Sequence, residues 1–150
     1  MNSPSRIVVG VDGSPAAKAA LVWAVQEAKR TNASVLALSV CQLSQSSSPF
    51  ADTHRNELAA AVDALGMTAD GVRIDQDVPF GQPGPTLVAL SQDADLLVVG
   101  DHGYTRAGVL VMSAVTSFCL RHARCPVVAV PLEGAHHDGP LMLRPETPVR

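Results

Sequence analysis

The sequence predicts an α/β fold in which helices pack on a parallel β-sheet. Segments typical of strands and of helices alternate along the chain, which is the pattern of parallel strands joined by helical crossovers. Hydrophobic residues make up 47% of the chain but aromatic residues only 3%, so the core must consist of Val, Leu and Ala. A length of 150 residues suits one domain with a sizeable core.

The first strand is predicted over Arg6 to Val11. A helix follows, because Ser14 is a favourable N-cap and Pro15 suits the first helical turn. The apolar residues of this helix recur at helical spacing and form one stripe: Ala17, Leu21, Ala24 and Ala28. The second strand is predicted over Ser34 to Cys41.

A serine-rich stretch, Gln42 to Pro49, is expected to be a flexible crossover loop because it cannot build a core. The second helix is predicted over Asp52 to Leu65, with Gly66 as the residue that ends it. The strand Val72 to Val78 is polar at alternate positions, so we expect it at an edge of the sheet with one face in water.

The second half of the chain repeats the alternation. A short helix carrying Leu87 and Leu90 precedes the strand Leu96 to Gly100. A fourth helix is predicted over Ser113 to Ala123, and the last strand over Val127 to Val130.

Domain organisation is expected to be simple, with one domain over residues 1–131 and a flexible C-terminal tail over 132–150. The tail is rich in Pro, Gly and His and lacks periodicity. No stretch approaches the roughly 20 apolar residues that span a bilayer, so we expect a cytoplasmic protein without membrane contact. The odd number of cysteines, all in or beside apolar segments, favours reduced core residues over disulfides: Cys41, Cys119 and Cys125.

The charge pattern limits the partners. The net charge is −3 and the only lysines are Lys18 and Lys29, so the chain lacks the basic footprint of a nucleic-acid-binding protein. It also lacks the lysine-bearing P-loop string. Phosphate recognition would therefore depend on backbone N–H groups, a helix N-terminus or an arginine.

Two apolar strands stop abruptly at glycine turns. Ile7 to Val11 leads into Asp12-Gly13-Ser14-Pro15, and Leu96 to Val99 leads into Gly100-Asp101-His102-Gly103. The carboxyl ends of parallel strands border the ligand crevice, and glycine lets the backbone approach a ligand closely. The two turns predict a nucleotide site.

With these turns, the chain resembles the universal stress protein family over nearly all of Arg6 to Val130. The matching strings are IVVGVDGSPAAKAALVWAV, VPFGQPGPTLVAL, DADLLVVGDHG and LRHARCPVVAV. The resemblance implies a three-layer sandwich with a five-stranded parallel sheet in the order 3-2-1-4-5, of the adenine nucleotide alpha hydrolase-like type. It also implies a homodimer, which we expect to form through the last strand. The nucleotide-binding branch of the family carries G-x2-G-x9-G-[ST].

That motif is half kept. Gly100 and Gly103 match the first two glycines, but Ser113-Ala114 stands where the branch has glycine followed by serine or threonine. The resemblance implies that Asp12 contacts ribose, that Val40 meets adenine through its backbone, and that the two glycines line the ribose and phosphates.

The departure favours adenosine, AMP or cAMP over ATP. The side chain of Ser113 can intrude on the phosphates, and Ala114 lacks the hydroxyl that would bond a terminal phosphate. The helix that Ser113 caps can still attract an anion. We include Gly13 and Ser14 of the first turn in the predicted site, and Arg106 as the cation nearest a phosphate.

Each of these residues also has a structural interpretation. Asp12 can be a turn carboxylate, Ser14 a helix cap, and His102 an exposed loop residue that at most touches phosphate. Tyr104 and Arg106 can be loop surface. Zinc binding is disfavoured, because three residues on a mostly apolar helical segment match no strong zinc pattern: Cys119, His122 and Cys125.

Three functions compete. The leading hypothesis is a non-catalytic regulatory protein of the stress response that binds an adenine nucleotide. The second is a degenerate relative that binds no ATP and acts as a dimeric interaction module. An ATP-hydrolysing enzyme ranks last, because neither a base held against a nucleophile nor a metal-binding acidic pair is evident at the glycine loop. A Ser-His-Asp hydrolase with Ser14, His102 and Asp12 is disfavoured, because Ser14 does not fit the G-x-S-x-G pattern and helix capping explains it more simply.

Overall fold

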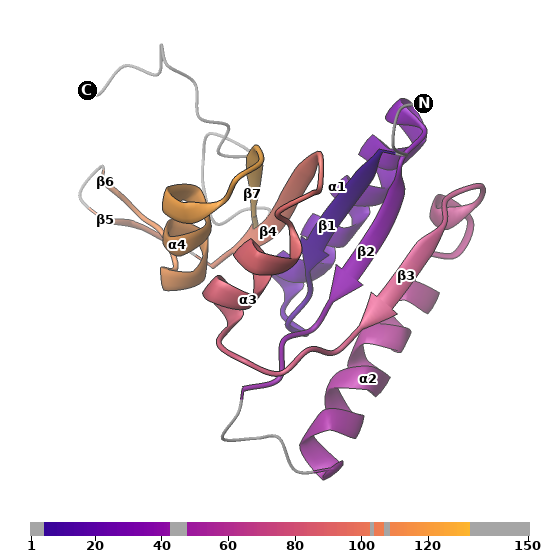
Figure 1. Cartoon of the computed structure of the whole chain (residues 1–150), viewed down its shortest axis with the longest axis horizontal. Helices are drawn as coiled ribbons and strands as arrows, with labels where there is room; N and C mark the ends of the chain where they lie inside the picture. Colours follow the sequence, from indigo (N-terminus) through magenta and orange to yellow (C-terminus); the bar gives the residue numbers. More distant parts are fainter. Residues whose placement is uncertain (1–4, 43–47, 103, 107–108, 133–150) are drawn as a thin grey trace.

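The computed structural model describes residues 5–42, 48–102, 104–106 and 109–132. Its centre is a five-stranded parallel sheet in the order β3-β2-β1-β4-β7, which confirms the predicted strand order and fold class (Figure 1). The strands are β1 (Arg6–Gly10), β2 (Ser34–Leu38), β3 (Ile74–Asp77), β4 (Leu96–Asp101) and β7 (Val127–Pro131).

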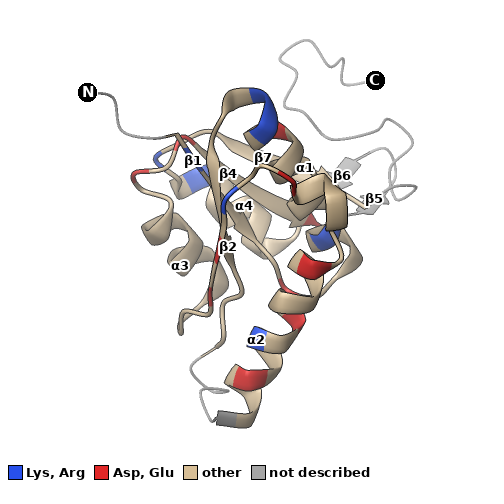
Figure 2. Ribbon diagram, turned by 90° about the vertical axis from the view of Figure 1, so that its right-hand side faces the viewer, with Lys and Arg blue, Asp and Glu red and all other residues tan. Residues whose placement is uncertain are grey.

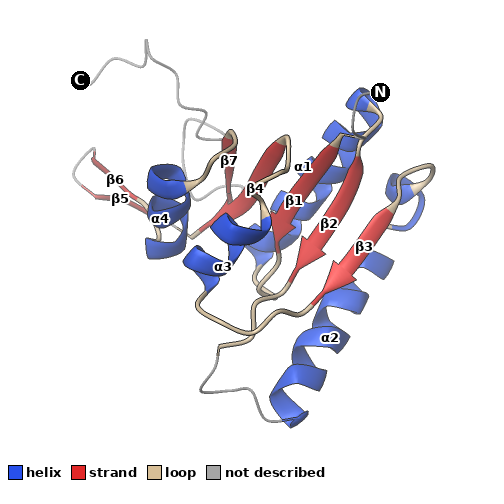
Figure 3. Ribbon diagram, viewed as in Figure 1, coloured by secondary structure: helices blue, strands red, loops and turns tan. Residues whose placement is uncertain are grey.

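Helices cover both faces of this sheet and complete a three-layer sandwich (Figure 3). They are α1 (Pro15–Thr31), α2 (Ser48–Asp63), α3 (Pro83–Leu90) and α4 (Ala114–His122). Alternate residues of β1 point to opposite faces: Val9 packs in the layer of α1 and α2, and Val8 in the layer of α3 and α4. Because both faces are covered, β1 is apolar at successive positions rather than at alternate ones.

Helix α1 forms where its signals predict. The hydroxyl of Ser14 accepts a hydrogen bond from the N–H of Ala17 at 3.2 Å, and Pro15 occupies the first turn. At the other end Asn32 adopts a left-handed conformation and caps the helix. The predicted apolar stripe is buried in full, and α1 packs against β1, β4 and β7.

Two helix boundaries differ from the expectation. Helix α2 begins at Ser48, inside the segment expected to be a loop, and residues 43–47 of that segment lie outside the described residues. It ends at Asp63 rather than Leu65, and a 3₁₀ turn, η2 (Gly66–Ala69), follows. Gly66 does adopt a positive φ of 52°, but at the start of this turn.

The segment after β4 contains a hairpin that the sequence reading treated as loop. Strand β5 (Tyr104–Arg106) pairs antiparallel with β6 (Val109–Val111) in a separate two-stranded sheet. Three-residue strands are too short for a clear alternating pattern, which is why the prediction failed. Strand β4 also extends to Asp101, one residue further than predicted.

The position of β3 agrees with its alternating polar residues. Strand β3 lies at one edge, as predicted, and β7 at the other. Helix α2 carries three acidic residues and one basic residue, which Figure 2 shows in red and blue. Among the described residues no helix is long and apolar enough to cross a membrane.

The cysteines form no disulfide, as expected. Burial raises the pKa of the Cys119 thiol to about 11, so it is protonated and unreactive at neutral pH. No group of potential metal ligands occurs in the part of the chain that the structure describes. The predicted tail, apart from Leu132, lies outside that part.

Candidate functional site

The site forms at the carboxyl ends of β1 and β4. The crossover after β1 runs along one face of the sheet through α1, and the crossover after β4 runs along the other face through α4. Neighbouring strands whose connections leave in opposite directions open a crevice between them. A cavity of about 180 Å³ occupies this position.

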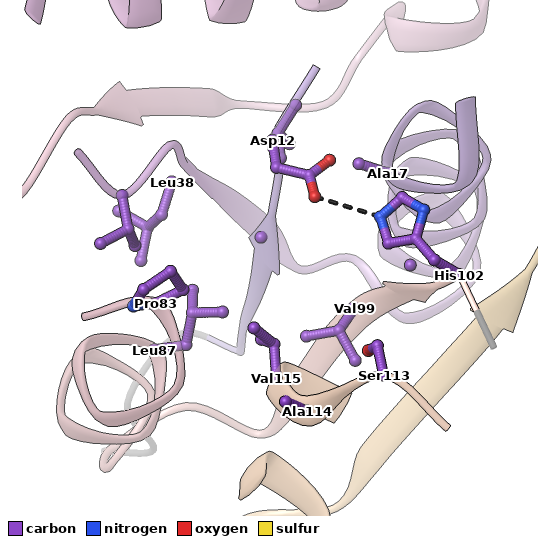
Figure 4. Close-up of a pocket in the computed structure, with 14 residues that line it drawn as sticks. Asp12, Ala17, Leu38, Pro83, Leu87, Val99, His102, Ser113, Ala114 and Val115 are labelled. Atoms are coloured by element: carbon purple, nitrogen blue, oxygen red, sulfur yellow. Dashed lines mark hydrogen bonds and ion pairs between the residues drawn. The ribbon is translucent and has the colours of Figure 1, made fainter. Parts of the chain in front are cut away.

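The cavity is apolar inside and polar at its rim. Its apolar walls come from strands β2 and β4 and helices α3 and α4: Leu38, Leu87, Val99 and Val115, with Pro83 beside them (Figure 4). Asp12 and His102 face each other across the rim. Ligand pockets usually have volumes of roughly 300 to 1,000 Å³, so this one can enclose a single ring system while the rest of a ligand lies at the mouth.

Asp12 is held as a charged acceptor. One carboxylate oxygen, Oδ1, accepts hydrogen bonds from the backbone N–H of Ser14 at 3.0 Å and from its hydroxyl at 2.5 Å. Partial burial by itself would raise the pKa of the Asp12 carboxyl, but the bonds from Ser14 and the contact with His102 outweigh it and hold the pKa below its usual range. The carboxylate is therefore ionised at neutral pH.

His102 contacts the other oxygen of this carboxylate. Its Nε2 lies 3.1 Å from Asp12 Oδ2, and because that oxygen can only accept, Nε2 donates. Both side chains are well exposed, 45% for His102 and 62% for Asp12. The pair bridges the ends of β1 and β4 at the mouth of the cavity.

Val40 directs its backbone into the same crevice. The N–H of Ser39 bonds to Asp77 and that of Cys41 to Pro79, so both point towards the β3 side. Peptide groups alternate in direction along an extended chain, so the N–H and C=O of Val40 point towards the β1 side. On that side, the chain that follows β1 turns away after the N–H of Val11 has bonded to the C=O of Leu38. This leaves one donor and one acceptor beside the apolar walls.

The N-terminus of α4 forms another side of the cavity. The hydroxyl of Ser113 accepts a bond from the N–H of Thr116 at 3.2 Å and donates to its Oγ1 at 2.8 Å, so it serves as the helix cap. The N–H of Ser113 donates to the buried carboxylate of Asp101 at 3.1 Å. Ala114 and Val115, the first residues of the helix, line the cavity.

Gly100 lines the cavity, but the reason for a glycine there differs from the expectation. A Cβ at this position would lie 2.5 Å from the backbone C and O of Ala16 and 2.6 Å from the N of Ala17. The missing side chain therefore faces α1, and glycine is needed so that the first turn of α1 can pack against β4. The conformational freedom of the residue is not what the site uses.

The structure brings together five of the predicted site residues on the cavity wall: Asp12, Val40, Gly100, Ser113 and Ala114. Gly13 has a φ of +83° and faces Glu57 of α2 instead, while Ser14 acts on Asp12 and as the cap of α1. Gly103 lies outside the described residues, as does the side chain of Arg106.

The polar groups do not form a hydrolytic triad. Asp12 stands between Ser14 and His102, whereas a triad needs the histidine between the serine and the carboxylate. The hydroxyl of Ser14 is also engaged as donor to Asp12 and as acceptor from Ala17. The arrangement offers an acceptor that can bind hydroxyl groups.

A family model described as the universal stress protein family matches residues 4–131. The chain belongs to this family. Universal stress protein Rv2624c of Mycobacterium tuberculosis (strain ATCC 25618 / H37Rv) is 32% identical over 134 residues, which are 83% of this chain and 47% of that protein. The chain thus spans about half the length of the curated relatives it matches.

Solved universal stress proteins have the same fold. A universal stress protein in complex with cAMP is 25% identical, with a TM-score of 0.63, and the match covers 86% of this chain and 98% of that one. A universal stress protein family protein from Arabidopsis thaliana with AMP bound is also 25% identical, with a TM-score of 0.63, over 87% and 94% of the two chains.

Within this universal stress protein domain, sequence reasoning missed the contact between His102 and Asp12 and the role of Asp101. The register pairs Ile7 with Leu96, an offset of 89 residues, which places His102 one step beyond the level of Asp12. Both residues follow predicted strands in the sequence, but their contact can be predicted only when the register of β1 and β4 is known. Asp101 was read as part of a turn, whereas it is the last residue of β4 and 1% exposed.

Proposed function

We propose that this protein is a non-catalytic regulatory module of the stress response that binds an adenine nucleotide in the cavity between β1 and β4. The observation that carries the proposal is the cavity, which combines apolar walls with the backbone N–H and C=O of Val40 directed towards the β1 side of the crevice. Adenine presents flat apolar faces and, along one edge, an acceptor nitrogen beside an amino group. The N–H and C=O of Val40 match that edge.

The ribose is assigned to the mouth of the cavity, beside Asp12. Its hydroxyls are donors, and an ionised carboxylate is acceptor only. Oδ2 of Asp12 is the oxygen that Ser14 does not use, and the ribose would share it with His102 or displace His102 from it. The proteins with cAMP and AMP at 25% identity support the same ligand class.

Family membership supports the regulatory role, and the geometry supports the absence of turnover. The hydroxyl of Ser14 at the rim donates to Asp12 and accepts from Ala17, so both of its roles are already in use within the turn. We propose that residues 1–131 act as one binding domain whose nucleotide state is sensed by partners or by a second copy of the chain.

Isothermal titration calorimetry with adenosine, AMP, cAMP and ATP tests the proposal. The wild-type protein should release heat with adenosine and AMP. Val40→Trp, which fills the adenine side of the cavity, should abolish this heat. Val22→Trp is the matched control, because Val22 is 38% exposed on α1 and does not line this cavity. Absence of heat with all four ligands at millimolar concentration would reject nucleotide binding.

One observation favours a second function, an interaction module that needs no nucleotide. Strand β7 is an outer strand, and in the described part of the chain it pairs with β4 alone. The N–H of Leu97 on β4 donates to the C=O of Pro126, so the backbone of Pro126 faces β4. Because backbone groups alternate in direction along a strand, those of Val128 also face β4 and those of Ala129 face outwards. An apolar edge with open backbone groups is suited to pairing with its twin in a closed, two-fold homodimer.

A further inference from the structure

A hydrogen bond joins Ser39 and His54 next to the cavity but outside its wall. The hydroxyl of Ser39 lies 2.8 Å from Nδ1 of His54, and Ser39 is 2% exposed. A hydroxyl can both donate and accept, so the bond forms with either tautomer of the ring. His54 is half-buried and lies between Ala51 and Leu58 on the buried face of α2. The bond therefore ties α2 to the residue that precedes Val40 in the chain.

The chain that follows β2 is held in the plane of the sheet by bonds from the β3 side. The N–H of Ser39 donates to the C=O of Asp77 at 3.1 Å. The N–H of Cys41 donates to the C=O of Pro79 at 2.9 Å, and the C=O of Cys41 accepts from the N–H of Gly81 at 3.0 Å. A bond from residue 79 to the C=O of Ser39 would complete this ladder, but proline has no N–H. The ladder is thus interrupted directly beside the peptide groups that face the crevice.

The bond between Ser39 and His54 acts in a direction that the ladder does not control. Bonds between strands lie in the plane of the sheet, whereas side chains stand roughly perpendicular to it. On the opposite face, the side chain of Val40 packs in the layer of α3 and α4. The chain at Val40 is therefore held from both faces, and this fixes the tilt of its N–H and C=O towards the crevice.

We propose that His54 is a positioning residue of the base site: its bond to Ser39 holds the peptide groups of Val40 at the angle at which they bind the edge of adenine. This inference rests on the proposed function. Without the bond, the chain at Val40 can rotate about the interrupted ladder, and hydrogen bonds weaken steeply as they depart from linearity. We expect the affinity for adenosine to fall about 3- to 10-fold, which is the contribution of one ordinary hydrogen bond.

Calorimetry on the full chain with adenosine and purine riboside tests this role. Purine riboside lacks only the 6-amino group, so the ratio of the two affinities reports on the bond from that group to the C=O of Val40. Wild type should prefer adenosine about fivefold or more. His54→Leu removes the ring nitrogen and should reduce the preference to about twofold or less. His54→Asn should restore it, because its amide can reach the position of Nδ1 and bond to Ser39.

Leu58→Ala is the matched control. Leu58 is 1% exposed and is the next buried residue on the same face of α2, so its truncation loosens the helix without removing the bond to Ser39. It should lower the free energy of unfolding in urea but leave the preference for adenosine unchanged. A general weakening of α2 would act on both nucleosides alike, whereas a change in the angle of Val40 acts on the amino group.

The outcomes separate this role from nucleotide binding itself. If both nucleosides bind and His54→Leu leaves the preference unchanged, or Leu58→Ala lowers it equally, the role of His54 is overturned and nucleotide binding stands. Ser39→Ala removes the same bond without leaving a buried hydroxyl unpaired, and an unchanged preference in this variant overturns the role even if His54→Leu does not fold. A wild-type preference near one also overturns it. If wild type binds neither nucleoside, the proposed function fails and the inference fails with it.

Discussion

Gly100 is predicted to be a packing glycine, and Gly100→Ala should destabilise the fold. A Cβ there would lie 2.5 to 2.6 Å from three backbone atoms of Ala16 and Ala17, where ordinary contacts begin at 3.4 Å. The first turn of α1 would have to move by about 1 Å, and rigid backbone cannot yield as a side chain does. Overpacking of this kind costs about 2 to 4 kcal/mol. For a domain of this size that corresponds to a fall in Tm of about 4 to 16 °C.

Gly10→Ala is the matched control. Gly10 ends the neighbouring strand β1 and lines the same cavity, but its added Cβ would meet the end of the Leu87 side chain at 3.0 Å. A flexible side chain can give way, so the cost should stay below about 1 kcal/mol. Urea unfolding, with the midpoint and the slope fitted separately, measures both values. Equal losses of stability for the two variants, or a loss below about 0.5 kcal/mol for Gly100→Ala, would refute the packing argument.

Three further predictions follow from single contacts. Asp12→Asn should lower the free energy of unfolding by about 1 kcal/mol at pH 7, because it weakens the hydrogen bonds that Ser14 donates to the carboxylate. The loss stays small because the side chain of Asp12 is 62% exposed, so water replaces part of these bonds. Since the pKa of this carboxyl lies below the ordinary 3.8, the difference between wild type and variant in urea unfolding should be complete above that pH and shrink below it; a constant difference down to pH 2 would contradict the assignment. Ser113→Ala should remove the cap of α4 and cost about 1 kcal/mol by the same assay, and a neutral result would contradict the capping role. Ala129→Pro should give monomers in light scattering while circular dichroism stays native, because it removes an outward N–H; a wild type that is already monomeric at high micromolar concentration would reject a dimer through β7.

The direction of the backbone groups on β7 decides which of its residues can test the dimer. A proline at Val128 would remove the N–H that faces β4, as the bond from Leu97 to Pro126 implies. It would therefore damage the sheet itself rather than its open edge. Position 129 separates the two effects, and only the register shows this.

The sequence alone determined the features that depend on neighbouring residues. The cap at Ser14 and the stripe of α1 follow from spacing, and both formed as predicted because they are satisfied within one helix and one face. The position of β3 at an edge follows from its alternating polar residues. The approximate site follows from the two glycine turns at the strand ends, whereas the order of the strands came from resemblance to a family, since local patterns do not specify which strands pair.

The tertiary structure alone decided the contacts that join distant strand ends. His102 meets Asp12 across 90 residues because β1 and β4 pair with a fixed offset, and no local pattern encodes that offset. For the same reason Asp101, read as a turn residue, becomes a buried partner of Ser113 once β4 runs one residue further. Gly100 shows most clearly what the sequence cannot specify. A glycine at the end of a strand gives the same sequence pattern whether a ligand or a helix packs against it, and only the position of α1 in space distinguishes the two cases.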